Sequence, residues 1–389
     1  MKKSLYALTL GGLGIGITEF VMMGLLPDIA KDLSITIPQA GHLISAYALG
    51  VVIGAPLLVA MAGKYPPKII LILLMVIFTV FNGLSAFAPD YITLFVSRVL
   101  AGLPHGAFFG VGSVVASRLA PKGKEAQAVA IMFAGLTLAN VAGVPLGTFI
   151  GHHYSWRYSF AIIVLVGLIT ILALKYWMPV IPANKNSNIK NELKFFKTTE
   201  SWLIVFMIAI GTGGLFAWIS YIAPLMTDVS GFAANSISYI LVLAGLGMML
   251  GNFLGGKLAD KFSPARASLY LLLAMVVSLV IVHSVSFNPV LSLIMTFITG
   301  AIAFALVAPI QMLMINTATG SEMLAAAVSQ AAFNIGNALG AFFGGIPLVM
   351  GYDYTSPALV GAAMAFGGAL FAWIIISRIR ARQKVAVIA

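Results

Sequence analysis

The sequence lacks cysteine and is poor in charge. No cysteine occurs among its 389 residues, so disulfide bonds and thiolate chemistry are excluded, and the redox compartment stays open. Charged residues make up only 8% of the chain, whereas soluble domains carry roughly 25%. Hydrophobic residues make up 61%, and the mean hydropathy is +1.05. This composition excludes an ordinary soluble domain and predicts an integral membrane protein.

Long apolar stretches recur along the whole chain. Each has about 20 residues, enough to cross a hydrocarbon core of about 30 Å. We therefore predict an all-α integral membrane protein with twelve spans. These cover residues 5–26, 41–62, 68–88, 91–117, 126–150, 156–178, 201–226, 235–256, 266–286, 289–313, 323–348 and 356–377. The start of the chain looks like a signal peptide, but no small-residue cleavage site follows, so we expect the first helix to be retained.

The net charge of +11 is distributed unevenly over the predicted connections. If the N-terminus lies in the cytoplasm, every basic residue except Lys31, Arg98 and Arg157 falls on the cytoplasmic side, which is 22 − 3 = 19 residues. The positive-inside rule then predicts that both termini are cytoplasmic. Because topology explains the basic balance, we expect the lipid bilayer as a partner and no nucleic acid.

The two halves of the chain repeat at a constant offset of 197 residues. Gly14 and Pro27 of the first half match Gly211 and Pro224 of the second. Two parallel sets of six helices are typical of transporters whose binding site lies between the halves. We predict an N-terminal six-helix bundle over 1–178, a cytoplasmic linker over 179–200, a C-terminal six-helix bundle over 201–378 and a cytoplasmic tail over 379–389.

The sequence offers no site for nucleotide hydrolysis. The glycine-rich stretch "GGLGIG", which begins at Gly11, lacks the Lys-Ser/Thr of a phosphate-binding loop and lies within a predicted helix. Close helix packing explains its small residues better. We therefore expect transport to be secondary, driven by a gradient, with no cofactor and no metal.

Several stretches resemble motifs of the major facilitator superfamily, and the resemblance covers essentially the whole chain. "SRVLAGLPHGAFFG", which contains Arg98, is similar to the family's fourth-helix motif, and "GLTLANVAGVPLGTFIG" to its fifth-helix antiporter motif. The loop "GKLADKFSPAR" is similar to the family's loop signature, with Ser263 in place of a glycine. The first-half copy of that loop, "VAMAGKYPPK", departs further from the signature.

The pattern looks most like the AraJ-type, arabinose-efflux-like branch of the twelve-helix drug:proton antiporters. The resemblance implies a secondary transporter of the bacterial inner membrane that works as a monomer, with small-molecule solutes and protons as its partners. It also implies that helices 1 and 4 border a central cavity.

Three ionisable residues lie deep in predicted spans, where each costs about 2.5–3.5 kcal/mol on insertion scales. Glu19 and Arg98 both lie seven residues from the outer ends of their spans, roughly 10 Å deep. His105 follows Arg98 by seven residues, so it projects from a similar face. Burial favours a neutral Glu19, whereas a nearby Arg98 favours the charged form.

We predict from this balance that Glu19, Arg98 and His105 couple transport to protons. Three alternatives stay open: a static ion pair between Glu19 and Arg98, a structural role for Arg98, and a packing role for a neutral His105.

The second half carries amides instead of deep ionisable residues. Gln330, Asn334 and Asn337 follow i, i+4, i+7 spacing and form one polar stripe on a helix. The predicted substrate-binding residues are Asn140, Trp218, Tyr221, Gln311, Gln330, Asn334 and Asn337. The alternatives are interhelical hydrogen bonds for the amides and anchoring at the outer membrane interface for the two aromatic residues.

Two further groups are predicted to take part in conformational gating. Gly143 and Gly147 have the spacing that permits tight helix packing, and Pro145 between them removes a helix hydrogen bond. We expect these residues to form a flexing seam between the halves on the outer side. The resemblance assigns a second gate to the loop signature, at Gly256, Asp260, Lys261 and Arg266.

The sequence favours a proton-coupled exporter of small neutral or amphipathic solutes that works by alternating access. Proton-coupled uptake of a sugar or metabolite is the alternative within transport, but the antiporter-like fifth helix argues against it. A membrane receptor or scaffold is the alternative outside transport, although neither needs buried ionisable groups. An enzyme is not expected, because Glu19, Arg98 and His105 make a poor catalytic set.

Overall fold

The computed structural model describes residues 2–62, 65–121, 125–182, 197–317 and 322–388. In these segments all regular elements are helices. They are α1 (Lys2–Asp32), α2 (Ile37–Ala62), α3 (Pro67–Ala86), α4 (Tyr91–Leu119), α5 (Glu125–Leu138), η1 (Ala139–Gly143), α6 (Val144–His153), α7 (Trp156–Trp177), α9 (Thr199–Gly211), α10 (Gly213–Ile219), α11 (Ile222–Pro224), η3 (Leu225–Val229), η4 (Ala234–Ser236), α12 (Ile237–Phe262), α13 (Pro264–Val285), α14 (Pro289–Ala305), α15 (Val307–Thr317), α16 (Glu322–Val349) and α17 (Ser356–Ile388). Within the described residues, twelve spans are long and apolar enough to cross a membrane. The predicted all-α fold with twelve spans is therefore confirmed.

Three spans are interrupted where the sequence predicts one continuous helix. The fifth is divided into α5, η1 and α6, the seventh into α9, α10 and α11, and the tenth into α14 and α15. In the fifth span, Pro145 has no N–H to donate, and the turn before it widens so that the Val144 N–H bonds to the Ala139 carbonyl, five residues back. The helix hydrogen bond that Pro145 is predicted to remove is thus accommodated by a π-helical turn.

The first helix is longer than predicted at both ends. Helix α1 continues through Pro27 to Asp32. The Asp32 carboxylate accepts hydrogen bonds from the Trp156 indole N–H at 3.0 Å and from the Arg157 guanidinium. These bonds join the C-terminal end of α1 to the start of α7.

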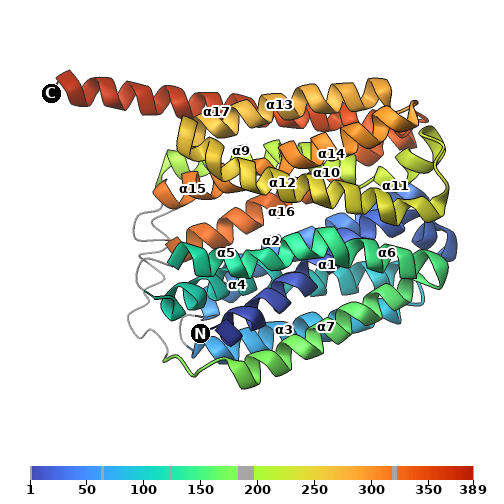
Figure 1. Ribbon diagram of the computed structural model, residues 1–389, viewed down its shortest axis with the longest axis horizontal. Coiled ribbons are helices and arrows are strands. Elements are labelled where there is room, and N and C mark those ends of the chain that lie inside the picture. Colours follow the sequence, from blue (N-terminus) through green and yellow to red (C-terminus); the bar gives the residue numbers. More distant parts are fainter. Residues whose placement is uncertain (1, 63–64, 122–124, 183–196, 318–321, 389) are drawn as a thin grey trace.

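The last helix is also longer than predicted, because it includes most of the expected tail. Helix α17 runs to Ile388 and extends beyond the neighbouring helices (Figure 1). Glu200, in the first turn of α9, forms ion pairs with Arg378 at 3.4 Å and with Arg382 at 2.6 Å. Residues 379–388 therefore continue the final span as one helix.

The helices form two neighbouring groups in the view of Figure 1, α1 to α7 in the lower part and α9 to α17 in the upper part. Helices α2 and α16 pack against each other across the two groups, as do α12 and the pair η1 and α6. We call α1 to α7 the first bundle and α9 to α17 the second bundle. Most of the predicted linker, residues 183–196, lies outside the described residues, and the predicted domain boundaries stay a prediction.

Small residues allow α16 to pack closely inside the second bundle. A Cβ atom added at Gly340 would lie 2.6 Å from the Gly213 carbonyl oxygen, and one at Gly344 would lie 3.1 Å from the Ala217 carbonyl oxygen. Such close backbone contact is a main source of helix association in membranes. It fixes α16 against α10, and with it the polar stripe predicted on α16.

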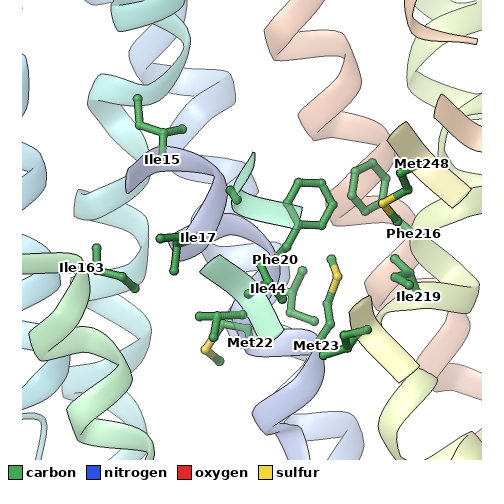
Figure 2. Packing of buried hydrophobic residues seen from close by; sticks show 14 of the residues in the cluster. Ile15, Ile17, Phe20, Met22, Met23, Ile44, Ile163, Phe216, Ile219 and Met248 are labelled. Carbon is green, nitrogen blue, oxygen red and sulfur yellow. The ribbon is translucent and has the colours of Figure 1, made fainter. Parts of the chain in front are cut away.

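The core between the two bundles is built on α1. Figure 2 shows Phe20, Met22 and Met23 of this helix among buried apolar side chains, with Phe216 and Met248 of the second bundle beside them. All five side chains are buried. Helix α1 is therefore the element that carries Glu19 into the contact between the bundles.

Candidate functional site

A cavity of about 580 Å³, including the part open to solvent, lies between the two bundles. Its lining residues of the fifth, tenth and eleventh spans come from the halves of those spans nearest the predicted cytoplasmic ends. The polar lining residues are Glu19, Asn140, Gln311, Ser329 and Gln330, and the aromatic ones are Phe20, Phe133, Phe304 and Phe333. The cavity thus combines one carboxylate, three amides and four aromatic rings.

The aromatic side chains form a connected group around this cavity. The Phe20 ring stacks on Phe216 with centroids 6.2 Å apart (Figure 2). The centroid of the Phe304 ring lies 6.4 Å from that of Phe20. Phe333 meets Phe216 edge-on at 5.2 Å. A smaller space of about 260 Å³ shares Phe20 and Asn140 with the larger cavity and extends toward the predicted outer side. Phe20 therefore lies where the two spaces meet.

Glu19 lies in the wall of the larger cavity with only 3% of its surface exposed. Its carboxylate accepts a hydrogen bond from the Asn337 amide of the second bundle, at 3.5 Å. Among the ion pairs of the described residues, none joins Glu19 to Arg98. The alternative of a direct ion pair between them is thus not what the structure contains, although the charge of Arg98 acts on Glu19 over a longer distance.

Arg98 is fully buried inside the first bundle and does not line the cavity. Its guanidinium donates to the Thr18 hydroxyl at 2.9 Å and to the Leu43 carbonyl at 3.4 Å. The guanidinium carbon also lies 4.4 Å from the centre of the Tyr47 ring, within the range of a cation–π interaction. These contacts join α1, α2 and α4, so they favour the structural role that the sequence left open for Arg98.

His105 is buried beside the same tyrosine. Its Nδ1 atom lies 3.1 Å from the Tyr47 hydroxyl, and its ring packs edge-on against Phe109 at 5.4 Å. It also interacts with the side-chain amide of Gln330, which lines the cavity from the second bundle. His105 thus connects the buried interior of the first bundle with the cavity wall.

The amides predicted on α16 do not all face the cavity. Gln330 lines it, whereas Asn337 binds Glu19. Asn334 donates to the Gln330 carbonyl of its own helix at 3.1 Å, and its side-chain oxygen is buried without a partner. On the other spans, Asn140 and Gln311 both line the cavity, as their predicted role requires.

Trp218 and Tyr221 lie away from the larger cavity. Both are 1% exposed, and neither is among the lining residues. The Tyr221 hydroxyl donates to the Ala341 carbonyl at 2.7 Å, and a Cβ added at Gly41 of the first bundle would lie 2.5 Å from that hydroxyl oxygen. Tyr221 therefore packs where α10, α16 and the start of α2 meet, on the side predicted to be outer.

Two of the residues predicted to form a seam between the halves pack against α1 of their own bundle. A Cβ at Gly143 would lie 2.5 Å from Ile17, and one at Gly147 would lie 2.9 Å from Val21, both on α1. The elements that carry them, η1 and α6, also contact α12 of the second bundle. A Cβ at Gly245 of α12 would lie 2.4 Å from the Asn140 carbonyl oxygen, so no side chain fits there. The flexing seam at these residues stays a prediction.

The loop signature lies at the end of α12, away from the cavity. Gly256 has open space around its Cα, and Lys261 and Arg266 are exposed. The Asp260 side chain is outside the described part of the structure. Ser263, which stands where the motif has a glycine, has φ +72°, a region that glycine adopts most readily. The backbone there explains why the motif favours glycine.

The four lining phenylalanines were not predicted from the sequence. Phe20 is adjacent to Glu19, which was the one available signal. The chain contains 25 phenylalanines, and many of them are expected to face lipid, so residue type alone does not single out a cavity wall.

Comparisons with known proteins agree with this architecture. A family model described as Major Facilitator Superfamily matches residues 8–345. The chain is 40% identical to the Putative transporter AraJ of Escherichia coli (strain K12), over 94% of this chain and 93% of that protein. It is 42% identical to the Inner membrane transport protein YdhP of the same organism, over 93% and 92%. It is 32% identical to a Chloramphenicol resistance protein of Streptomyces lividans, over 87% and 88%.

The fold also matches that of a solved transporter. A crystal structure of a D-xylose-proton symporter superposes with a TM-score of 0.75 at 18% identity, covering 95% of this chain and 97% of the other. Together with the twelve spans, these findings confirm the predictions of the family, of an integral membrane protein of bacteria, and of a transporter rather than an enzyme.

Proposed function

Because the chain belongs to the major facilitator superfamily, we propose that it is a proton-coupled exporter of small neutral or amphipathic solutes that works by alternating access. The observation that carries this proposal is the cavity between the bundles. Its wall holds one carboxylate, from the first bundle, and amides from both bundles. A site shared by two bundles is what rocking of one bundle against the other requires.

The lining of the cavity favours solutes with no charge or a single charge. The amides of Asn140, Gln311 and Gln330 can donate to and accept from hydroxyl or carbonyl groups. The phenylalanine rings offer apolar faces on which a sugar ring or an aromatic drug can stack. Lysine and arginine are absent from the described lining residues, so a dianion would meet a carboxylate with no compensating base. The proposal therefore excludes dicarboxylates as good substrates.

Glu19 is proposed as the proton site because it is the carboxylate in the cavity wall. Export requires that binding of solute and binding of a proton weaken each other, which is a reciprocal coupling between two equilibria. A carboxylate that touches the same space as the solute meets this condition. Arg98 and His105 are proposed to support it from within the first bundle, since neither lines the cavity.

The name of one relative, Chloramphenicol resistance protein, favours export over uptake. Removal of a drug from the cell is a direct way for a transporter to give resistance. The name Inner membrane transport protein, carried by YdhP, supports the same membrane for this chain.

Flux into proteoliposomes, with a pH difference imposed, tests this proposal. We expect neutral sugars or singly charged drugs to be concentrated by the parent protein. The variant Glu19→Gln should exchange solute across the membrane but fail to concentrate it. Fast transport of a dicarboxylate, or uphill transport by Glu19→Gln equal to that of the parent, would overturn the proposal.

Both termini are proposed to be cytoplasmic, which places the larger cavity toward the cytoplasm. The absence of native cysteine gives a clean background for labelling. A cysteine introduced as His153→Cys should react with an impermeant thiol reagent in intact cells, and one introduced as Lys197→Cys should not. The reverse pattern would invert the topology.

A further inference from the structure

Two hydrogen bonds of described side chains cross from the first bundle to α16 at adjacent positions. Ser45 of α2 donates to the Ala338 carbonyl at 2.9 Å, and Asn337 donates to Glu19 of α1 at 3.5 Å. The first bond joins two neutral groups. The second ends on a carboxylate, so its strength depends on whether that carboxylate carries a proton, because charge-assisted hydrogen bonds are roughly twice as strong as neutral ones.

The Asn337 side chain has an unused acceptor. It is fully buried, its Nδ2 donates to Glu19, and its Oδ1 has no hydrogen-bond partner. An uncharged carboxyl group has an O–H that needs an acceptor, whereas a carboxylate only accepts. A rotation of the amide would bring Oδ1 to the place of Nδ2. Asn337 can therefore bind Glu19 in either protonation state, with the stronger bond to the charged one.

We propose that Asn337 is the positioning residue through which the second bundle responds to protonation of Glu19. This inference rests on the proposed function, because it takes Glu19 as the proton site. The charged carboxylate holds α16 against α1 in the arrangement of this structure. Protonation replaces the charge-assisted bond with a neutral one and lowers the population of that arrangement. The role of Asn337 is thus to make the position of α16 depend on the protonation state of Glu19, which differs from the solute binding predicted for it.

The surroundings of Glu19 leave few other routes for this response. The charged and titratable groups that act on it are Arg98 of α4 and Tyr47 of α2, with His105 of α4 one contact further, on the tyrosine hydroxyl. All three belong to the first bundle, and of them His105 also reaches the second bundle, at the Gln330 amide. In the described lining of the cavity, α5, α14, α15 and α16 present no ionisable side chain beside Glu19. Asn337 is its hydrogen-bond partner in the second bundle.

Distance measurements between spin labels on the two bundles test the proposal. Labels at Lys31→Cys and Ala234→Cys report the opening of the outer ends, where both positions are exposed. Between about pH 8.5 and about pH 5.5, we expect the ratio of closed to open outer ends to fall by about tenfold in the parent. In Asn337→Leu this pH response should fall to less than about twofold.

Ser45→Ala is the matched control, because it also removes a bond to α16. It should change the closed-to-open ratio by the same factor at every pH and keep the response of the parent. If Asn337→Leu keeps the full pH response while Glu19→Gln loses it, the inference is wrong and the proton site stands. If Glu19→Gln keeps the response, the proposed proton site itself is wrong.

A second variant keeps the test valid if Asn337→Leu does not fold. Asn337→Asp places a second carboxyl group against Glu19. Two neighbouring carboxyl groups keep one shared proton up to a higher pH than a single carboxyl group does. The pH midpoint of the distance change should rise by more than about one unit. A midpoint equal to that of the parent would overturn the inference.

Discussion

The two bundles divide the chemistry of the cavity between them. The first bundle supplies its ionisable residues, of which only Glu19 reaches the wall, while Arg98 and His105 stay enclosed. The second bundle supplies uncharged amides, Gln311 and Gln330. The carboxylate that we propose as the proton site lies on one side of the cavity, and the amides that we propose to bind a neutral solute lie on both. Glu19 and Arg98 have the same predicted depth in the membrane and are both buried, yet they contact different groups. Depth in the membrane alone therefore does not identify a functional ionisable residue.

The largest effect on stability is expected from Arg98→Met. This change leaves the Leu43 carbonyl and the Thr18 hydroxyl without the donor that they share. We expect a loss of roughly 2–4 kcal/mol in the free energy of unfolding, measured by thermal denaturation in detergent. Arg378→Met is the control, because its ion pair with Glu200 is partly exposed and such pairs contribute about 0–1 kcal/mol.

A different result would change the comparison. If Arg98→Met is as stable as the parent but fails in proton-coupled transport, Arg98 has a coupling role and the first bundle contributes two functional charges.

A smaller effect, confined to solute binding, is expected from Gln311→Ala. The amide lines the cavity, so its loss should weaken the affinity for a transported solute by about five- to tenfold, which corresponds to one hydrogen bond. Asn334→Ala is the control, since Asn334 bonds to its own helix and is not a lining residue. Calorimetric measurements of solute binding should show this loss of affinity in Gln311→Ala and the affinity of the parent in Asn334→Ala. Equal losses of affinity would mean that a place in the cavity wall does not distinguish Gln311 from Asn334.

The smallest effect is expected from Tyr221→Phe. The change removes the hydrogen bond to the Ala341 carbonyl and should cost about 1 kcal/mol of stability. Solute affinity should stay within about twofold of the parent, because Tyr221 does not reach the larger cavity. A tenfold loss of affinity would restore the solute-binding role that the sequence predicts for it.

The sequence predicts the architecture better than the site. Apolar runs predict the twelve spans, and the cost of a buried charge points to Glu19, Arg98 and His105 alike, because both signals depend on composition along one helix. The partners of a residue depend on how helices rotate and cross, which the sequence pattern does not specify. The stripe of Gln330, Asn334 and Asn337 therefore has three different surroundings, and Tyr221 faces a carbonyl instead of a solute.

Proton release on solute binding tests most directly whether Glu19 links the two bundles to the proton gradient. Solubilised protein in weak buffer is mixed with a solute that proteoliposomes have shown to be transported, and the change in pH is recorded. We predict that the parent releases protons at a pH where Glu19 is partly protonated, and that Glu19→Gln binds the solute with no release. Release from Glu19→Gln equal to that of the parent would contradict the assignment of Glu19 as the proton site.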